Sequence, residues 1–181
     1  MRAARATDRG ASGRRPYQGP IPPPDNVCDT RTGLTLHEGL PQVNDKTGAR
    51  ALRFVTSAEV EVEELPWGPH EWLCRPGLTD ARDLLLVRVR MPPGTGHAFH
   101  RHPGMEEIIY VISGAAEQWV DQASRRLGPG DSAHIPKDMV HGTYNAGDET
   151  LVLLAILSPA TCAGPASVDV SADAPWNALR L

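Results

Sequence analysis

The sequence predicts an all-β protein, and three observations support this fold class. Short stretches in which apolar and polar residues alternate recur between residues 51 and 157. Pairs of turn-forming residues separate these stretches, and no segment of useful length carries apolar residues at helical spacing. Alternation with a period of two is typical of strands that bury one face and expose the other. We therefore expect one antiparallel β-domain.

The strands expected from this alternation follow one another closely. Residues 115–120 and 122–127 read as a hairpin that turns near Asp121. Residues 150–157 are apolar on both faces, which favours a central strand or a dimer interface, and we expect a homodimer. The full set of predicted strands is 53–55, 59–65, 84–91, 107–112, 115–120, 122–127, 132–135, 141–144 and 150–157.

The two ends of the chain lack this pattern. Residues 1–47 begin with an arginine-rich, proline-rich stretch that has almost no large apolar residues, so we expect an irregular or disordered arm. Residues 48–160 form the predicted β-domain. Residues 161–181 are mostly small or polar and are interrupted by prolines. We expect them to form a tail that packs on the surface of the domain through Trp176 and Leu179.

Composition limits the partners and the compartment. A net charge of -4 and a pI near 5.9 give no electrostatic reason to expect nucleic acid or an anionic membrane as a partner. No stretch reaches about 18 consecutive apolar residues, so we predict no membrane span. The three cysteines are far apart in the sequence, which favours a reducing, cytoplasmic location.

A His-x-His pair indicates a metal site. His100 and His102 point to the same face of an extended strand, because side chains on a strand alternate. Pro103 and Gly104 then predict a turn into a returning strand that begins with two glutamates, Glu106 and Glu107. One of these carboxylates is expected close to both imidazoles, which gives most of the first coordination shell of a metal ion. The fourth ligand should come from elsewhere.

The spacing around these residues resembles the first motif of the cupin superfamily. That motif is a glycine, five residues, His-x-His, three or four residues, a glutamate, six residues and a glycine. Gly94, His100, His102, Glu107 and Gly114 match it. The resemblance selects Glu107 as the ligand and leaves Glu106 on the opposite side of the strand, as an outer-sphere or solvent-facing acid.

A second stretch resembles the second cupin motif. Gly130, Pro136, His141 and Asn145 match its spacing, whereas Asp138 stands where the family usually has glycine. Aspartate tolerates a left-handed backbone, so we expect this departure to be mild. The resemblance implies a double-stranded β-helix, or jelly-roll barrel. It also implies a divalent ion, such as Fe, Mn, Ni or Zn, bound by His100, His102, Glu107 and His141.

The resemblance implies a metal-dependent protein but does not fix its reaction. We expect an enzyme that acts on a small polar organic molecule with a carboxylate, keto or diol group, in a dioxygenase-like or isomerase-like reaction. The alternative is a non-catalytic protein that binds a metal and a small metabolite. A transcription regulator would need a helical DNA-binding domain, and the sequence predicts none.

Four further residues are candidates for catalysis or substrate binding. Glu106 follows from the first motif, and His134 lies on a strand that leads into the site. Arg88 and Arg90 share one face of their strand, and two interpretations are open. Either both are solvated at a sheet edge or interface, or one enters the barrel and binds a substrate carboxylate, for which a planar guanidinium is well suited.

Three further aromatic residues lie close to these motifs in the sequence. Trp67 and Trp72 either line the mouth of a pocket or pack against the outer sheet. His97 lies outside the ligand positions of the motif and is expected to be a loop residue or a neighbour of the ligands.

Overall fold

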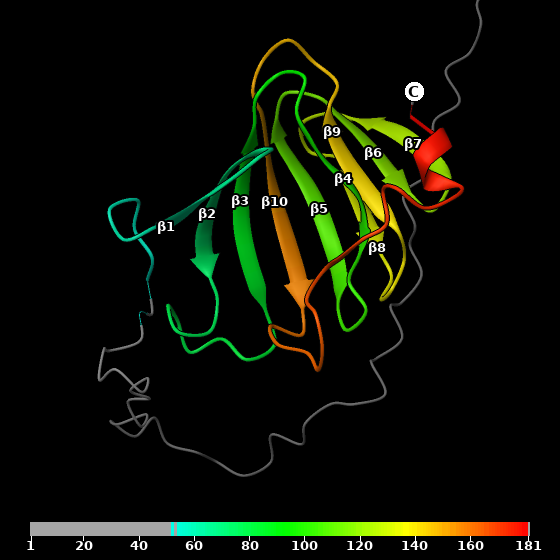
Figure 1. Cartoon of the computed structure of the whole chain (residues 1–181). Helices are drawn as coiled ribbons and strands as arrows, with labels where there is room; N and C mark the ends of the chain where they lie inside the picture. The colour runs from blue at the N-terminus through cyan, green and yellow to red at the C-terminus, as the bar shows by residue number, and fades with distance from the viewer. Residues whose placement is uncertain (1–51, 53, 181) are drawn as a thin grey trace, which may run out of the picture. The chain divides into compact units, whose positions relative to one another are not determined.

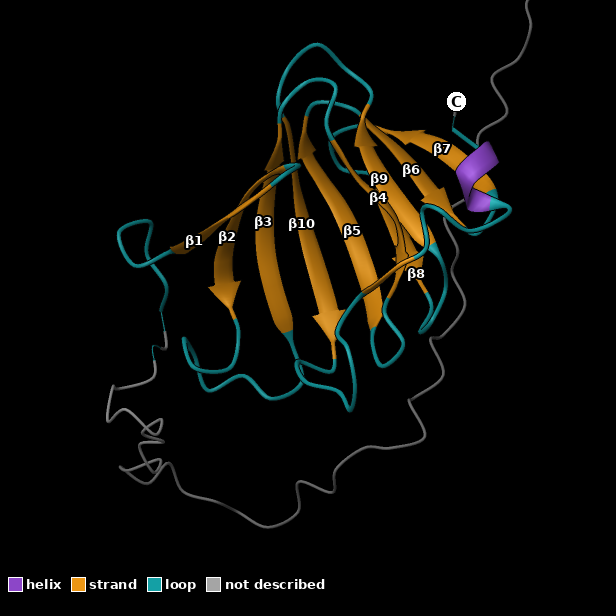
Figure 2. Cartoon of the chain, viewed as in Figure 1, coloured by secondary structure: helices purple, strands orange, loops and turns teal. Residues whose placement is uncertain are grey.

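The computed structural model describes residue 52 and residues 54–180, and they fold into two antiparallel sheets. Figures 1 and 2 show the strands side by side and one short helical turn near the C-terminus. The all-β prediction is therefore confirmed. Within the described residues no helix is long and apolar enough to cross a bilayer. The predicted arm at residues 1–47 lies outside the described residues.

The larger sheet has six strands in the order β1-β2-β3-β10-β5-β8. Strand β10 lies between β3 and β5 and pairs with both, so the apolar segment predicted to be central is central. The strands are β1 (Glu61–Leu65), β2 (Gly68–Cys74), β3 (Leu85–Met91), β10 (Leu151–Ser158), β5 (Glu106–Ser113) and β8 (Ser132–Ile135).

The smaller sheet has five strands in the order β11-β4-β9-β6-β7. The hairpin predicted around Asp121 is confirmed as β6 paired with β7, and Asp121 has a φ of 52° at the turn. The strands are β11 (Val168–Asp169), β4 (Gly96–Arg101), β9 (His141–Asn145), β6 (Ala116–Val120) and β7 (Ala123–Leu127).

The core lies between the inner faces of the two sheets. On β3, Val87 and Val89 are buried, as are Ile109 and Val111 on β5 and Leu153 on β10. These positions follow the period of two in the sequence, because every second side chain of a strand points inward. Each large apolar side chain buried in this way stabilises the fold by roughly 1.5–3 kcal/mol.

Two predictions about local structure need correction. Phe54 and Val55 belong to no strand, although alternation predicted one there, and Phe54 is 84% exposed. The strands β4 and β5 are not a hydrogen-bonded pair, because β5 pairs with β10 and β8 in the other sheet. The turn after His102 therefore carries the chain from one sheet to the other, and the ligands on either side of it face each other across the barrel.

The tail is more ordered than its composition indicates. Strand β11 pairs with the outer edge of β4, and a 3₁₀ turn forms at Trp176–Ala178. The Trp176 ring packs against Phe99 with centroids 5.8 Å apart. The tail therefore closes the edge of the sheet that carries two of the predicted ligands.

The outer face of β5 exposes a row of apolar side chains. Ile108, Tyr110 and Ile112 are each 41–43% exposed. The predicted homodimer stays a prediction.

Candidate metal centre

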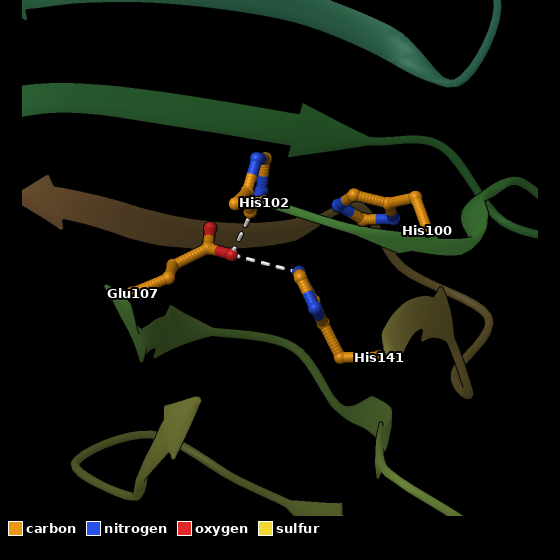
Figure 3. Close-up of side chains that lie close together, drawn as sticks. All are labelled: His100, His102, Glu107 and His141. Atoms are coloured by element: carbon orange, nitrogen blue, oxygen red, sulfur yellow. Dashed lines mark ion pairs between the residues drawn. The ribbon is translucent and has the colours of Figure 1, made fainter. Parts of the chain in front are cut away.

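Four buried side chains, from three strands and the turn after β4, converge between the two sheets. His100 lies on β4 and pairs in register with His141 on β9, His102 follows the end of β4, and Glu107 lies on β5. One ligand atom from each residue lies within 4.8 Å of the others. Figure 3 shows the Glu107 carboxylate between His102 and His141, with His100 beside them. The sequence predicted these four residues as metal ligands, and the structure brings them together.

Each of the three histidines is oriented by a backbone carbonyl. The Nδ1 atom of His100 lies 2.7 Å from the Ala98 oxygen, that of His102 lies 2.6 Å from the Ala166 oxygen, and that of His141 lies 3.0 Å from the Met139 oxygen. A carbonyl only accepts, so Nδ1 carries the proton and donates it. The lone pair of each ring is therefore on Nε2, as a metal ligand requires.

The centre of the cluster has polar atoms without hydrogen-bond partners. Glu107 Oε2 lies 3.3 Å from His102 Nε2 and 2.8 Å from His141 Nε2. Among the described residues, however, neither Glu107 Oε2 nor His141 Nε2 makes a hydrogen bond, and both atoms are buried. Buried polar atoms that approach this closely without a hydrogen bond need another partner. A divalent cation fits this arrangement, because imidazole nitrogen and carboxylate oxygen are its usual ligands.

Burial and mutual contact shift the pKa values of the cluster. Burial alone would raise the pKa of Glu107, but the imidazoles of His102 and His141 outweigh it and hold this pKa well below its usual range. Burial would lower the pKa of His102, but the contact with Glu107 raises it. Burial lowers the pKa of His100 well below its usual value, so this ring is neutral at pH 7 and ready to bind a metal.

His97 packs directly behind one of the ligands. Its ring stacks on His100 with centroids 3.6 Å apart and on Trp67 with centroids 4.0 Å apart. His97 lies three positions before His100, so regular alternation would place them on opposite faces. The pairing of β4 with β9 is irregular between these residues, and both side chains line the same cavity. His97 is therefore a neighbour of the ligands, and burial lowers its pKa to about 4.

The cluster lies on the wall of a cavity of about 160 Å³. The rest of this wall is mainly apolar and comes mostly from β2, β3, β5 and β10 of the larger sheet. Both Trp67 and Trp72 line the cavity, so the pocket interpretation of these residues is the one that the structure supports. The apolar side chains in the wall include Leu85, Val87, Val89, Met91, Leu153 and Leu157.

The two arginines on β3 do not reach this cavity. Both Arg88 and Arg90 form ion pairs with Glu71 of β2, and the Arg90 Nε to Glu71 Oε1 distance is 2.8 Å. Their strand turns Val87 and Val89 to the inside instead. The interpretation that one arginine binds a substrate carboxylate inside the barrel is therefore wrong.

Glu106 and His134 also lie away from the cluster. Their side chains form an ion pair of 3.2 Å, and each is 58% exposed. Neither lines the cavity. As candidates for catalysis in the barrel they are contradicted, because each faces outward from its strand.

Sequence reasoning missed two contributors to the site. His70 on β2 is buried and lines the cavity, and its alternation with Gly68 and Trp72 was the available signal. Ala166 supplies the carbonyl that orients His102, and it lies in the tail predicted only to touch the surface. A backbone carbonyl carries no sequence signal, so only the folded chain could place it.

Comparisons with known proteins agree with this geometry. The cupin domain family matches residues 87–157, which include all four residues of the cluster. The chain is 32% identical over 107 residues to the polyketide synthase CurC of Streptomyces cyaneus, a match that covers 59% of this chain and 70% of CurC.

Solved structures show the same fold. KdgF from Halomonas sp. superposes with a TM-score of 0.53 at 25% identity, over 60% of this chain and 94% of KdgF. An oxalate decarboxylase from Bacillus subtilis, described with Mn(II) centres, superposes with a TM-score of 0.54 at 28% identity. That match covers 63% of this chain but only 31% of the decarboxylase chain.

Proposed function

The chain belongs to the cupin superfamily, and from that premise we propose that it is a metal-dependent enzyme acting on a small organic molecule. The proposed ligands of the divalent ion are His100, His102, Glu107 and His141. The proposed substrate binds through oxygen atoms of a carboxylate, keto or diol group, and the reaction is oxygenase-like or isomerase-like. The observation that carries the proposal is the convergence of four buried ligand atoms on the wall of a cavity.

The residues of the chain have distinct roles in this proposal. The carbonyls of Ala98, Met139 and Ala166 hold the three imidazoles in one tautomer and one orientation. Glu107 offsets half of the charge of a divalent ion, and the apolar wall keeps water from the bound molecule. Four protein ligands leave positions free on a six-coordinate ion, which would act as a Lewis acid or bind dioxygen.

The proposal is tested by identifying the metal and then looking for turnover. The protein is purified without oxygen, its metal content is measured by elemental analysis, and oxygen consumption is followed with keto acids, catechols and flavonols. We expect a nearly stoichiometric divalent metal and turnover with one of these classes. A protein that retains no divalent metal at neutral pH would overturn the proposal.

One observation favours a second candidate function, a non-catalytic protein that binds a metal and a small molecule. None of the four residues predicted as catalytic candidates, Glu106, His134, Arg88 and Arg90, lies in the cavity. Full metal content with ligand binding, but without turnover of any compound class, would select this candidate.

A further inference from the structure

The side chains that line the cavity outside the metal cluster determine which class of molecule the cavity can bind. Apart from the cluster, the described residues that line the cavity are apolar or aromatic, with His70, His97 and Thr143 as the polar exceptions. No lysine or arginine is among them. A second carboxylate of a ligand would therefore be buried without a cation to pair with it, which is costly in free energy.

The polar groups in the wall outside the cluster add no free charge. The Thr143 hydroxyl already donates to Gln118 Oε1 at 2.7 Å. The indole Nε1 of Trp67 has no acceptor among the described residues, but it is fully buried, so it does not face the open space of the cavity. The wall therefore favours an apolar body over a charged one.

The size of the cavity sets an upper bound on the apolar part of the ligand. A volume of about 160 Å³ is close to the ~150 Å³ of an engineered apolar cavity that binds benzene. The space therefore suits a single ring or a short apolar chain in addition to the chelating oxygens.

We propose that this cavity takes a molecule with one chelating pair of oxygens on an apolar or aromatic body the size of a single ring, and that it discriminates against molecules whose body carries a further carboxylate. The inference rests on the proposed metal site, and it narrows the substrate class expected from the sequence. The charged end of the ligand is confined to the cluster, while its body contacts Trp67, Trp72 and the apolar wall.

Catechol and 3,4-dihydroxybenzoate are the probes that test this inference. Both chelate through two neighbouring oxygens on a single ring, but the second carries a carboxylate that would lie against the apolar wall. The full chain is loaded with Zn²⁺, which has no redox chemistry, and binding is measured by calorimetry without oxygen. We expect catechol to bind at least about tenfold more tightly than 3,4-dihydroxybenzoate, because the ring carboxylate loses its hydration without gaining a partner.

Two variants sharpen this test. Trp67→Phe shortens an aromatic wall that the body of the ligand contacts, so it should weaken the binding of both probes several-fold. Trp119→Phe is the matched control, because Trp119 does not line the cavity. Zinc-loaded protein that binds 3,4-dihydroxybenzoate as tightly as catechol would overturn the ligand class and leave the metal site intact. Protein that retains no zinc would instead contradict the proposed function.

A second inference rests on His70, whose geometry repeats that of the ligands. Its Nδ1 lies 3.3 Å from the carbonyl oxygen two residues earlier, at Gly68, just as His100 and His141 are oriented by Ala98 and Met139. Gly68 has a φ of 130°, and a Cβ there would lie 1.9 Å from the Arg90 carbonyl oxygen, so the position requires glycine. The sequence therefore fixes the carbonyl that orients His70.

His70 has the orientation of a ligand but is not part of the cluster. The residue is 9% exposed and lines the same cavity, yet it is absent from the group of four whose ligand atoms lie within 4.8 Å of one another. Because Nδ1 donates to Gly68, Nε2 carries the lone pair. Burial lowers the pKa of His70, although Glu63 and Glu107 oppose this, so the ring is neutral at pH 7.

We infer that His70 Nε2 accepts a proton from the molecule bound in the cavity. The O–H bond of a chelating hydroxyl breaks, its electron pair stays on the ligand oxygen, and the proton forms an N–H bond on His70. The imidazolium that results is held close to the negative charges of Glu107 and the ligand, which stabilise it.

Proton counting tests this role without relying on turnover. Calorimetry of catechol binding to the zinc-loaded protein, repeated in buffers of different ionisation enthalpy, gives the number of protons released to solvent. His70→Gln should release about one proton more than the wild type, because the proton no longer stays on the protein. His70→Asn serves as a second variant if the first is poorly folded.

The exposed His134 provides the control, since His134→Gln should match the wild type. Equal proton release from wild type and His70→Gln would overturn the role of His70 while leaving the metal site and the ligand class untouched. A wild type that does not bind catechol would overturn both inferences.

Discussion

Two neighbouring carboxylates on β5 each contact histidine, but on opposite faces of the strand. Glu107 lies inside the barrel, where its side chain is 6% exposed and approaches His102 and His141. Glu106 lies outside, where it pairs with His134 and both side chains are 58% exposed. The same two residue types therefore form one pair in the interior and one in solvent.

The comparison shows that environment, not residue type, decides what such a pair can do. An exposed ion pair contributes about 0–1 kcal/mol to stability, because water solvates both partners almost as well. A buried carboxylate among several imidazoles is costly unless a further partner compensates it, and a divalent cation supplies that partner. The inner group is thus suited to bind a metal, whereas the outer pair is a surface contact.

The largest expected difference is in metal content. Glu107→Gln should lower metal affinity by at least ~100-fold, because it removes the only anionic ligand, whereas outer-sphere changes typically cost 10–100-fold. His100→Ala should have a similar effect. Glu106→Gln is the matched control and should retain the metal of the wild type. Elemental analysis after dialysis checks all three, and metal loss in Glu106→Gln alone would reverse the assignment of the two glutamates.

The second largest effect is expected in the pH dependence of the free energy of unfolding of the metal-free protein, and it arises from the buried histidines of the inner face. His97 and His100 have folded pKa values below the unfolded value near 6.5, so the unfolded state binds more protons as the pH falls. Stability should therefore decrease between pH 6.5 and 4, by roughly 3 kcal/mol for His97 alone. The raised pKa of His102 stabilises the fold by an amount that is fully present below pH 6.5 and is lost as the pH rises through the folded pKa, so it does not change the slope between pH 6.5 and 4.

Urea unfolding at several pH values measures this effect. His97→Phe keeps a stacked ring but cannot bind a proton, so its stability should fall less on acidification than that of the wild type. Below pH 4.5 the loss should continue in both proteins, because Glu107 contributes its stability only above its unfolded pKa. Identical pH profiles for the two proteins would show that His97 is not buried in the neutral form.

A smaller effect should follow from shortening the tail. Ending the chain at Ala160 removes the Ala166 carbonyl that orients His102, and loss of such an outer-sphere partner lowers metal affinity by about 10–100-fold. Ending it at Ser171 keeps Ala166 and β11 and removes the 3₁₀ turn with the contacts of Trp176 and Arg180, so metal binding should persist. Equal metal affinity in the two truncations, measured by competition with a chelator, would rule out this role of Ala166.

The smallest effect is expected on the outer face. His134→Ala should change the free energy of unfolding by no more than about 0.5 kcal/mol, because the pair with Glu106 is exposed. Urea unfolding at neutral pH checks this value. A loss of more than about 2 kcal/mol would mean that the pair of Glu106 and His134 is covered in solution and that the two faces of β5 differ less in exposure.

Much of the fold could be predicted because period and spacing are local properties. The strands at residues 84–91 and 150–157, the hairpin about Asp121 and the four converging side chains all follow from short patterns. Asp138 takes a φ of 64°, the left-handed backbone expected where the motif has glycine. Such features depend on which residues are near one another in sequence, so the sequence reveals them directly.

By itself the sequence determined the fold class, the barrel strands and which four side chains share one face or one end of a strand. Only the tertiary structure decided that Arg88 and Arg90 face outward, because alternation shows that two faces differ but not which is inside. It alone placed His70, His97 and the Ala166 carbonyl around the cluster. These contacts depend on the irregular pairing of β4 with β9, on the packing of one sheet against the other and on the position of the C-terminal tail, and none of these is a local property of the sequence.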